Sequence, residues 1–181
     1  MGEGSTMMVL ESEESAKSRD ANIYGYLVGY GSSTDAFHIT APSEGGIGSS
    51  RAMDASFKDA SLNPEAINYI NAHGTSTIIN DATETTAIKR SFGSAAENVA
   101  ISSTKSMVGH LLGGAGAFES MVCLMAIKDG VIPPTINLDS PDEECDLNYT
   151  PNNSIEKDIS YAMTNSFGFG GHNAVLIFSR N

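Results

Sequence analysis

The chain has 181 residues, of which 40% are hydrophobic and 18% are charged, and its formal net charge is −12. Such a composition is typical of a globular domain large enough to bury its own core. The acidic excess argues against binding to nucleic acid or to an anionic membrane surface, because both are recognised by clustered Lys and Arg. We expect neither a signal peptide nor a membrane span. The sparse, unpaired cysteines fit a cytoplasmic protein.

Strand and helix signals alternate along the chain. In the first third we expect strands at residues 7–10 and 23–30, helices at 11–19 and 50–60, and a Gly-, Ser- and Thr-rich loop over 31–50. Further along we expect strands at residues 67–72, 99–102, 159–165 and 173–179, helices at 80–90 and 109–128, a Pro- and Asp-rich connection over 131–149, and a glycine-rich turn at 168–171. This alternation predicts an α/β fold with a five-stranded mixed sheet flanked by helices.

The ends of two predicted helices carry capping signals. Asn80 and Asp81 are expected to cap the helix over 80–90, and Gly130 to end the helix over 109–128. The second helix is apolar around most of its circumference, so it must be buried on more than one side. We expect it in a central layer, covered by another chain or by another part of the same polypeptide. In isolation it would expose a large apolar patch and promote dimerisation or aggregation.

Three polar loops follow or join predicted strands, which is where α/β folds place their chemistry. They cover residues 71–77 with His73, residues 102–110 with Lys105 and His110, and residues 165–173 with Phe169. We expect these loops to form one composite site. His73 and His110 could then donate paired N–H groups to a developing oxyanion or enolate.

Lys105 would be a cation close to the two histidines, and three acids are candidates to balance its charge. These acids are Asp81, Glu84 and Glu119. Other interpretations remain open on this evidence. His73 alone could be a packed histidine and Lys105 a surface lysine, and His38 and His172 are interpreted as supporting residues.

Two further site types are disfavoured by spacing. His38, His73 and His110 could in principle bind a metal ion, but no HxH or HxxxH spacing supports it, so we expect no metal site of this kind. Residues 113–116 are rich in glycine but lie within a predicted helix. A dinucleotide fingerprint lies between a strand and a helix, so small residues here favour close helix packing instead.

The loop sequences closely resemble those of the β-ketoacyl-acyl-carrier-protein synthases, the elongating condensing enzymes of type II fatty-acid synthesis. The matching motifs are INAHGTST (70–77), SSTKSMVGH (102–110), NSFGFGGHN (165–173) and DAFHITAP (35–42). The resemblance covers essentially the whole chain, and among subgroups it is strongest to bacterial enzymes that elongate longer acyl chains. It implies a thiolase-like fold in which residues 1–181 form the C-terminal half.

The resemblance also implies that the nucleophile is absent from this chain. The family's nucleophilic cysteine belongs to an N-terminal half, and the opening Met-Gly-Glu-Gly resembles an internal motif of the family. Cys123 lies in an apolar helical pattern and is interpreted as a buried structural thiol, and Cys145 as an exposed loop thiol. Neither has the strand-to-helix context of a nucleophile.

In the family, the full enzyme transfers an acyl group from acyl carrier protein or coenzyme A to this cysteine, decarboxylates malonyl-acyl carrier protein, and condenses the carbanion with the acyl group. By resemblance, His73 and His110 match the pair that stabilises the enolate. Lys105 matches the lysine that orders this region, with Asp81, Glu84 and Glu119 as its acidic neighbours.

The remaining matches concern substrate binding. Thr75 and Thr77 match residues that contact the phosphopantetheine arm, and Phe169 matches a gating phenylalanine on a Gly-flanked loop. His38 and Thr40 match pocket or arm contacts. Some relatives also bind a structural cation near the segments that match Asn71 and residues 165–166.

The resemblance implies no cofactor other than the phosphopantetheine carried by acyl carrier protein. The implied partners are acyl carrier protein, the N-terminal half or a second synthase chain, and a second copy of the full enzyme in a homodimer. Two alternatives stay open: a catalytically inactive truncated or interaction subunit of a condensing enzyme, and a free-standing hydrolase or lyase that uses His73 and His110 without a covalent intermediate.

Overall fold

A computed structural model describes residues 1–181 and has a five-stranded mixed sheet at its centre. The strands are β1 (Tyr26–Thr34), β2 (Tyr69–Asn71), β3 (Ala100–Ser102), β6 (Tyr161–Gly168) and β7 (His172–Ser179). They lie in the order β1-β7-β6-β2-β3. The pairs β2–β3 and β2–β6 are parallel, whereas β7 is antiparallel to both β1 and β6. The predicted sheet is therefore confirmed.

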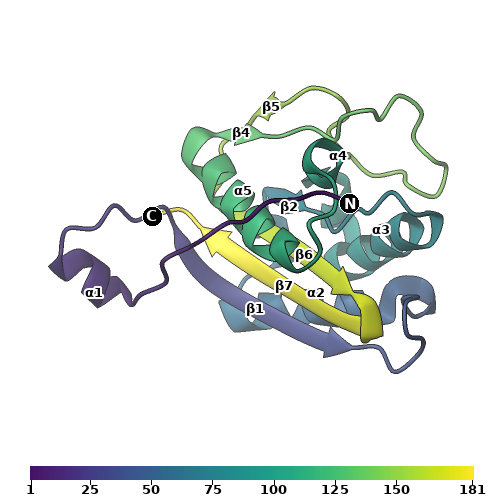
Figure 1. Cartoon of the computed structure of the whole chain (residues 1–181), viewed down its shortest axis with the longest axis horizontal. Helices are drawn as coiled ribbons and strands as arrows, with labels where there is room; N and C mark the ends of the chain where they lie inside the picture. The colour runs from purple at the N-terminus through teal and green to yellow at the C-terminus, as the bar shows by residue number, and fades with distance from the viewer.

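Helices cover both faces of this sheet (Figure 1). Its flanking helices are α2 (Ile47–Ala60) and α3 (Ile78–Phe92) on one face and α5 (Ala115–Asp129) on the other. The pleat separates two cores, because successive residues of a strand point to opposite faces. Ile70 and Met163 join the core under α2 and α3, whereas Tyr69 and Ala162 join the core under α5.

The shorter elements lie around these layers. They are α1 (Glu13–Ser18), α4 (Lys105–Val108), the small ladder of β4 (Val131–Ile132) and β5 (Ile155–Glu156), and the 3₁₀ turns η1 (Glu44–Gly46), η2 (Pro64–Ala66), η3 (Gly93–Glu97), η4 (Leu112–Gly114) and η5 (Phe169–Gly171). No helix of the protein combines the length and apolarity needed to cross a bilayer.

Several predicted boundaries were wrong. Residues 7–10 form no strand: their backbone has no ladder partner, and the side chains of Met7 and Val9 are 97% and 86% exposed. Thr77, and not the Asn80-Asp81 pair, caps α3, with its Oγ1 accepting from Asn80 N at 3.4 Å.

The single helix predicted over residues 109–128 is shorter and begins later. Gly109 ends α4 at φ +74°, the η4 turn follows, and α5 begins only at Ala115. Gly130 ends α5 in the left-handed conformation as predicted.

Helix α5 has two apolar faces, as the sequence indicated. One face, with Cys123, Ala126 and Ile127, is buried in the core against the sheet. The other face carries Phe118 and Met121, which are half-buried. Residues three or four apart lie on the same face of a helix, so the second face is a continuous apolar strip.

Helix α2 lies directly on β1 because two glycines remove the side chains between them. A Cβ atom on Gly29 would lie 2.7 Å from the carbonyl oxygen of Ser56, and one on Gly31 would lie 1.9 Å from that of Ala52. Both distances are far shorter than a van der Waals contact, and the opposing atoms belong to the helix backbone. Any side chain at these positions must therefore push α2 off the sheet.

We predict that Gly31→Ala lowers the free energy of unfolding by about 1–3 kcal/mol, the usual effect of overpacking. The midpoint of urea unfolding measures this change. Gly113→Ala is the matched control, because no atom lies within 4 Å of the position of its Cβ. It should change stability by no more than about 0.5 kcal/mol, and equal losses in both variants would contradict the close packing of α2 on β1.

Candidate active site

The structure brings the two predicted histidines together. His73 follows β2 and is buried, and His110 follows α4 and is half-buried. Their ring centroids are 5.6 Å apart and the ring planes are nearly perpendicular, at 84°. Phe167 of β6 also packs against His73, with a centroid distance of 5.8 Å. All three predicted loops thus contribute to one place.

The carboxylate of Glu84, on α3, holds the His73 loop. Its two oxygens accept hydrogen bonds from the backbone N–H groups of His73 at 2.9 Å and Gly74 at 2.8 Å. Oε1 also accepts from Asn165 Nδ2, on β6, at 3.1 Å. Burial raises the pKa of Glu84, an effect that the three hydrogen bonds oppose. Glu84 forms no ion pair with Lys105, although the charge of Lys105 also opposes the rise of its pKa, and its direct partners are the histidine loop and Asn165.

The structure places Glu119, of α5, against Lys105. The two side chains form an ion pair, and both are almost completely buried. Asp81 makes no ion pair with Lys105 and instead accepts a hydrogen bond from the side chain of Asn80 at 3.0 Å. Its predicted place beside Lys105 is corrected, because Asp81 lies in the first turn of α3 and makes no ion pair there.

The surroundings of both histidines lower their pKa values and so favour the neutral rings. Burial lowers the pKa of His73 to about 3, and the positive charge of Lys105 adds to this effect. Burial and Lys105 also lower the pKa of His110. Burial raises the pKa of Glu119 to about 7, although the Lys105 charge opposes it.

The hydrogen bonding of His110 fixes its tautomer. The backbone N–H of Leu112 donates to His110 Nδ1 at 3.0 Å, so a neutral ring must carry its proton on Nε2. The outward nitrogen of His110 is then a hydrogen-bond donor. A neutral donor that is held in place before charge develops is what an oxyanion hole requires.

The predicted binding residues lie at the surface in two pairs. Thr75 and Thr77 are hydrogen-bonded through their hydroxyl groups at 3.1 Å. His38 Nδ1 accepts from the backbone N–H of Thr40 at 3.1 Å. None of these four side chains hydrogen-bonds to His73 or His110 in the structure.

Phe169 is 72% exposed in a turn that is tied to the His38 loop. The N–H of Gly170 donates to the carbonyl oxygen of Ile39 at 2.7 Å. Phe37, His38, Ile39 and Gly170 line an open hollow of about 410 Å³ between the two segments. The Phe169 turn and the His38 loop therefore share one surface.

Sequence reasoning missed two residues that join the loops. Ser103 Oγ donates to the carbonyl oxygen of Gly74 at 2.7 Å and so links the Lys105 loop to the His73 loop. Asn165 links β6 to Glu84. Both lie within the quoted motifs, but nothing local in the sequence distinguishes a bridging polar side chain from its polar neighbours.

Three buried side-chain oxygens on the α5 side of the sheet lack hydrogen-bond partners. Asn71 Oδ1, Thr164 Oγ1 and Glu119 Oε2 are buried and have no hydrogen-bond partner. Asn71 and Thr164 are paired in the β2–β6 ladder, and α5 packs on both strands. Oxygen donors of this kind suit a hard cation. Asn165 points to the opposite face, toward Glu84.

The three-histidine metal site is not formed. No group of three or more His, Cys, Asp or Glu side chains lies close enough to hold a metal ion. The ring of His38 is bound to the backbone of its own loop, with Nδ1 also accepting from Ala41 N at 3.2 Å.

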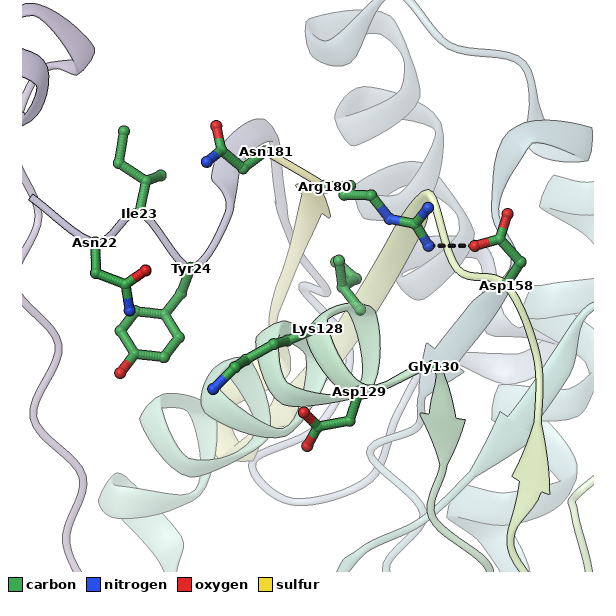
Figure 2. Close-up of a pocket in the computed structure, with 10 residues that line it drawn as sticks. Asn22, Ile23, Tyr24, Lys128, Asp129, Gly130, Asp158, Arg180 and Asn181 are labelled. Carbon is green, nitrogen blue, oxygen red and sulfur yellow. Dashed lines mark hydrogen bonds and ion pairs between the residues drawn. The ribbon is translucent and has the colours of Figure 1, made fainter.

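A separate cavity lies beside Lys128, Asp129 and Gly130, at the C-terminal end of α5 (Figure 2). It has a volume of about 470 Å³. Lys128 lies 5.3 Å from the centroid of the Tyr24 ring, and Arg180 is paired with Asp158. A helix of 15 residues spans roughly 22 Å. This cavity is therefore separate from the candidate active site.

With fold and site described, the chain can be placed among known proteins. It belongs to the family described as "Beta-ketoacyl synthase, C-terminal domain", whose model matches residues 24–139. The curated relatives it resembles include 3-oxoacyl-[acyl-carrier-protein] synthase 2 of Staphylococcus aureus (strain COL), 54% identical over 180 residues. The protein of the same name from Synechocystis sp. is 55% identical over 180 residues. The alignments cover 99% of this chain but only 44% and 43% of these relatives.

Solved structures of ketosynthases have the same fold. A β-ketoacyl synthase from Burkholderia phymatum superposes with a TM-score of 0.89 at 42% identity, over 94% of this chain and 41% of that one. A ketosynthase bound to a hexaketide, in complex with its type II PKS acyl-carrier protein, gives a TM-score of 0.92 at 42% identity, over 94% and 42% of the two chains. The thiolase-like fold predicted from the motifs is confirmed.

We predict that, in the presence of a chelator that keeps metal ions away from Glu119, this residue makes stability fall as the pH rises from 4.5 to 7. The native pKa of about 7 lies above the usual value of 4.5, so the native state keeps a proton that the unfolded state releases. This contribution is complete below pH 4.5 and is lost as the pH rises through 7. It amounts to at most about 3 kcal/mol.

Comparison with Glu119→Gln isolates this contribution. His73 gives an opposite slope, because its lowered pKa makes stability fall as the pH drops below its usual value of 6.5. That slope is common to both proteins and cancels in the difference between their urea-unfolding curves. Glu97→Gln, at an exposed position, is the control. A difference between Glu119→Gln and the unmodified chain that does not change with pH would contradict the raised pKa.

Proposed function

We propose that this chain is the part of a 3-oxoacyl-[acyl-carrier-protein] synthase that stabilises the enolate during decarboxylative Claisen condensation in fatty-acid elongation. The observation that carries this proposal is the pair of neutral rings of His73 and His110, 5.6 Å apart, with the Nε2–H of His110 free to donate. Similarity to 3-oxoacyl-[acyl-carrier-protein] synthase 2 over 99% of the chain supports it.

The chemistry requires neutral donors of this kind. When a malonyl thioester loses carbon dioxide, the electron pair of the broken C–C bond remains as an enolate with negative charge on the thioester oxygen. Two imidazole N–H groups would stabilise that oxygen as charge develops. Burial is the main cause of the lowered pKa values of both histidines, and the buried positive charge of Lys105 is the second. Both effects favour the neutral rings.

The enolate carbon would then attack the thioester carbonyl of an acyl-cysteine, forming the new C–C bond and releasing the cysteine thiolate. Cys123 cannot be this nucleophile, because it is completely buried and its Sγ donates to the carbonyl oxygen of Met163 at 3.5 Å. Burial also raises the pKa of Cys145, which disfavours its thiolate. The chain spans less than half of its curated relatives, and we place the cysteine in the remainder.

Substrate binding follows from the surface loops. Thr75, Thr77, His38 and Thr40 would contact the phosphopantetheine arm of acyl carrier protein, which is the only prosthetic group required. Phe169 would gate access to the cysteine, since its turn contains Gly170 and Gly171 at positive φ. Asn71, Thr164 and Glu119 would hold a structural cation, which would neutralise the unpaired carboxylate oxygen of Glu119.

The proposed partners are acyl carrier protein and the N-terminal half or second synthase chain that brings the cysteine, in a cytoplasmic homodimer of the complete enzyme. Residues 1–181 would then form the C-terminal thiolase-like domain of that enzyme. The apolar second face of α5 supports a covering partner, because such a strip is stable only when it is buried. A second candidate function is a catalytically inactive truncated or interaction subunit. The burial of Cys123 favours this second function when the chain acts without a partner.

We predict that His73→Ala and His110→Ala each slow malonyl-acyl carrier protein decarboxylation by about 10²–10³ in the protein combined with the N-terminal half. Acyl loading of the cysteine should change far less, because it does not pass through the enolate. The measurement is release of labelled carbon dioxide beside transfer of a labelled acyl group. Glu97→Gln is the control variant.

The outcomes separate the two candidate functions. Decarboxylation that survives both substitutions would refute the enolate assignment. Combined halves that associate but neither load acyl groups nor decarboxylate would favour the inactive subunit. Condensation by the chain alone would place the nucleophile within residues 1–181.

A further inference from the structure

The N-terminal residues lie against the loop that carries His110. The backbone N–H of Gly2 donates to the carbonyl oxygen of His110 at 2.9 Å. This bond joins two segments that are more than one hundred positions apart in the sequence, and it involves the backbone of the candidate catalytic residue itself.

The contact is possible only because glycines face each other. A Cβ atom on Gly2 would lie 2.1 Å from the carbonyl oxygen of Val108. Gly109 has a φ of +74°, and a Cβ there would lie 3.0 Å from Gly2 N. A side chain at residue 2 would meet backbone atoms, which cannot rotate away. Replacing Gly2 or Gly109 by any other residue must therefore separate the two segments.

The next residue of the loop is held by the same segment. The side chain of Leu111 lies over both N-terminal glycines, because Cβ positions on Gly2 and Gly4 fall 3.2 Å and 2.9 Å from its methyl carbons. Residues 2–4 therefore contact the chain immediately before and immediately after His110. We call residues 2–4 the N-terminal strap.

The backbone N–H groups of Val108 and Gly109 bond to the first turn of α4, at the carbonyl oxygens of Thr104 and Lys105. The His110 ring itself is less supported, because Val108 and Leu112 are exposed and its one hydrogen bond comes from Leu112 N. That bond sets the Nε2–H tautomer, and it depends on the turn between residues 110 and 112 keeping its shape. The strap is what packs against that turn.

We propose that the N-terminal strap positions His110, with Gly2 as the positioning residue, by clamping residues 108–111 so that Leu112 N stays bonded to His110 Nδ1 and the Nε2–H is directed into the site. The strap would act on His110 and not on His73, whose loop is held by Glu84. The use of this proton in catalysis rests on the proposed function. The position and the tautomer of His110 do not depend on that function.

The test is nuclear magnetic resonance of the whole chain with ¹⁵N-labelled histidine, which reports the tautomer of each ring without any activity assay. In the unmodified chain, His110 should be protonated on Nε2. In Gly2→Ala the separation between its two ring ¹⁵N shifts should shrink by about twofold as the tautomers interconvert. The amide of Leu112 should exchange with solvent about tenfold faster, and the His73 signals should not change.

Gly113→Ala is the control, since it lies in the same loop with no atom within 4 Å of its Cβ position. It should leave His110 unchanged. A chain that starts at Ser5 lacks the strap and introduces no clash. It is the second variant to measure if Gly2→Ala does not fold. It should reproduce the change in His110 while signals of the central sheet are retained.

Three results would overturn the inference: an unmodified chain in which His110 is not protonated on Nε2, unchanged His110 signals in the chain that starts at Ser5, or equal changes at His73 and His110. The second and third results leave the proposed function standing, whereas the first would also remove the Nε2–H donor on which that function rests. The proposed function fails by its own test if decarboxylation survives the loss of both histidines.

Discussion

The carboxylate of Glu84 is the interaction on which the site depends. It is completely buried and must therefore be satisfied by hydrogen bonds. Its partners are the N–H groups of His73 and Gly74, from the loop after β2, and the amide of Asn165, from β6. One side chain of α3 thus fixes the position of that loop relative to a neighbouring strand. Because the carboxylate makes no bond to Lys105, the histidine loop is held by an acceptor and not by an ion pair.

A second buried acid has a different task. Glu119 reaches Lys105 from α5, so the packing of α5 on the sheet sets where the positive charge lies. That charge helps to keep the nearby imidazoles neutral. Because the two acids have separate partners, the protein can keep the charged Lys105 and the buried carboxylate of Glu84 close to two neutral histidine rings. A buried ion pair is weak evidence for stability, and its value here lies in the electrostatics of the histidines.

The two histidines are supported unequally. His73 is enclosed by Phe167, Glu84 and its own strand, whereas His110 lies in a short, partly exposed connection between α4 and α5. Glycines bring distant backbone into contact with that connection, in the same way that Gly31 brings α2 onto β1. Close backbone approach is a recurring construction in this chain, and it makes positions that appear featureless in the sequence intolerant of any side chain.

The sequence by itself determined the fold class, the order of the main strands and helices, and the three loops that meet at the site. These features follow from local signals: apolar periodicity, glycine at turns, and short polar motifs after strands. Residues 7–10 have a strand composition, but a strand exists only with a hydrogen-bonding neighbour, and the structure provides none. Only the tertiary structure decided that Glu119 and not Asp81 pairs with Lys105, that Glu84 accepts backbone donors, and that Gly2 packs against Gly109. Each of these depends on distances between segments far apart in the chain, which are set by packing and not by local sequence.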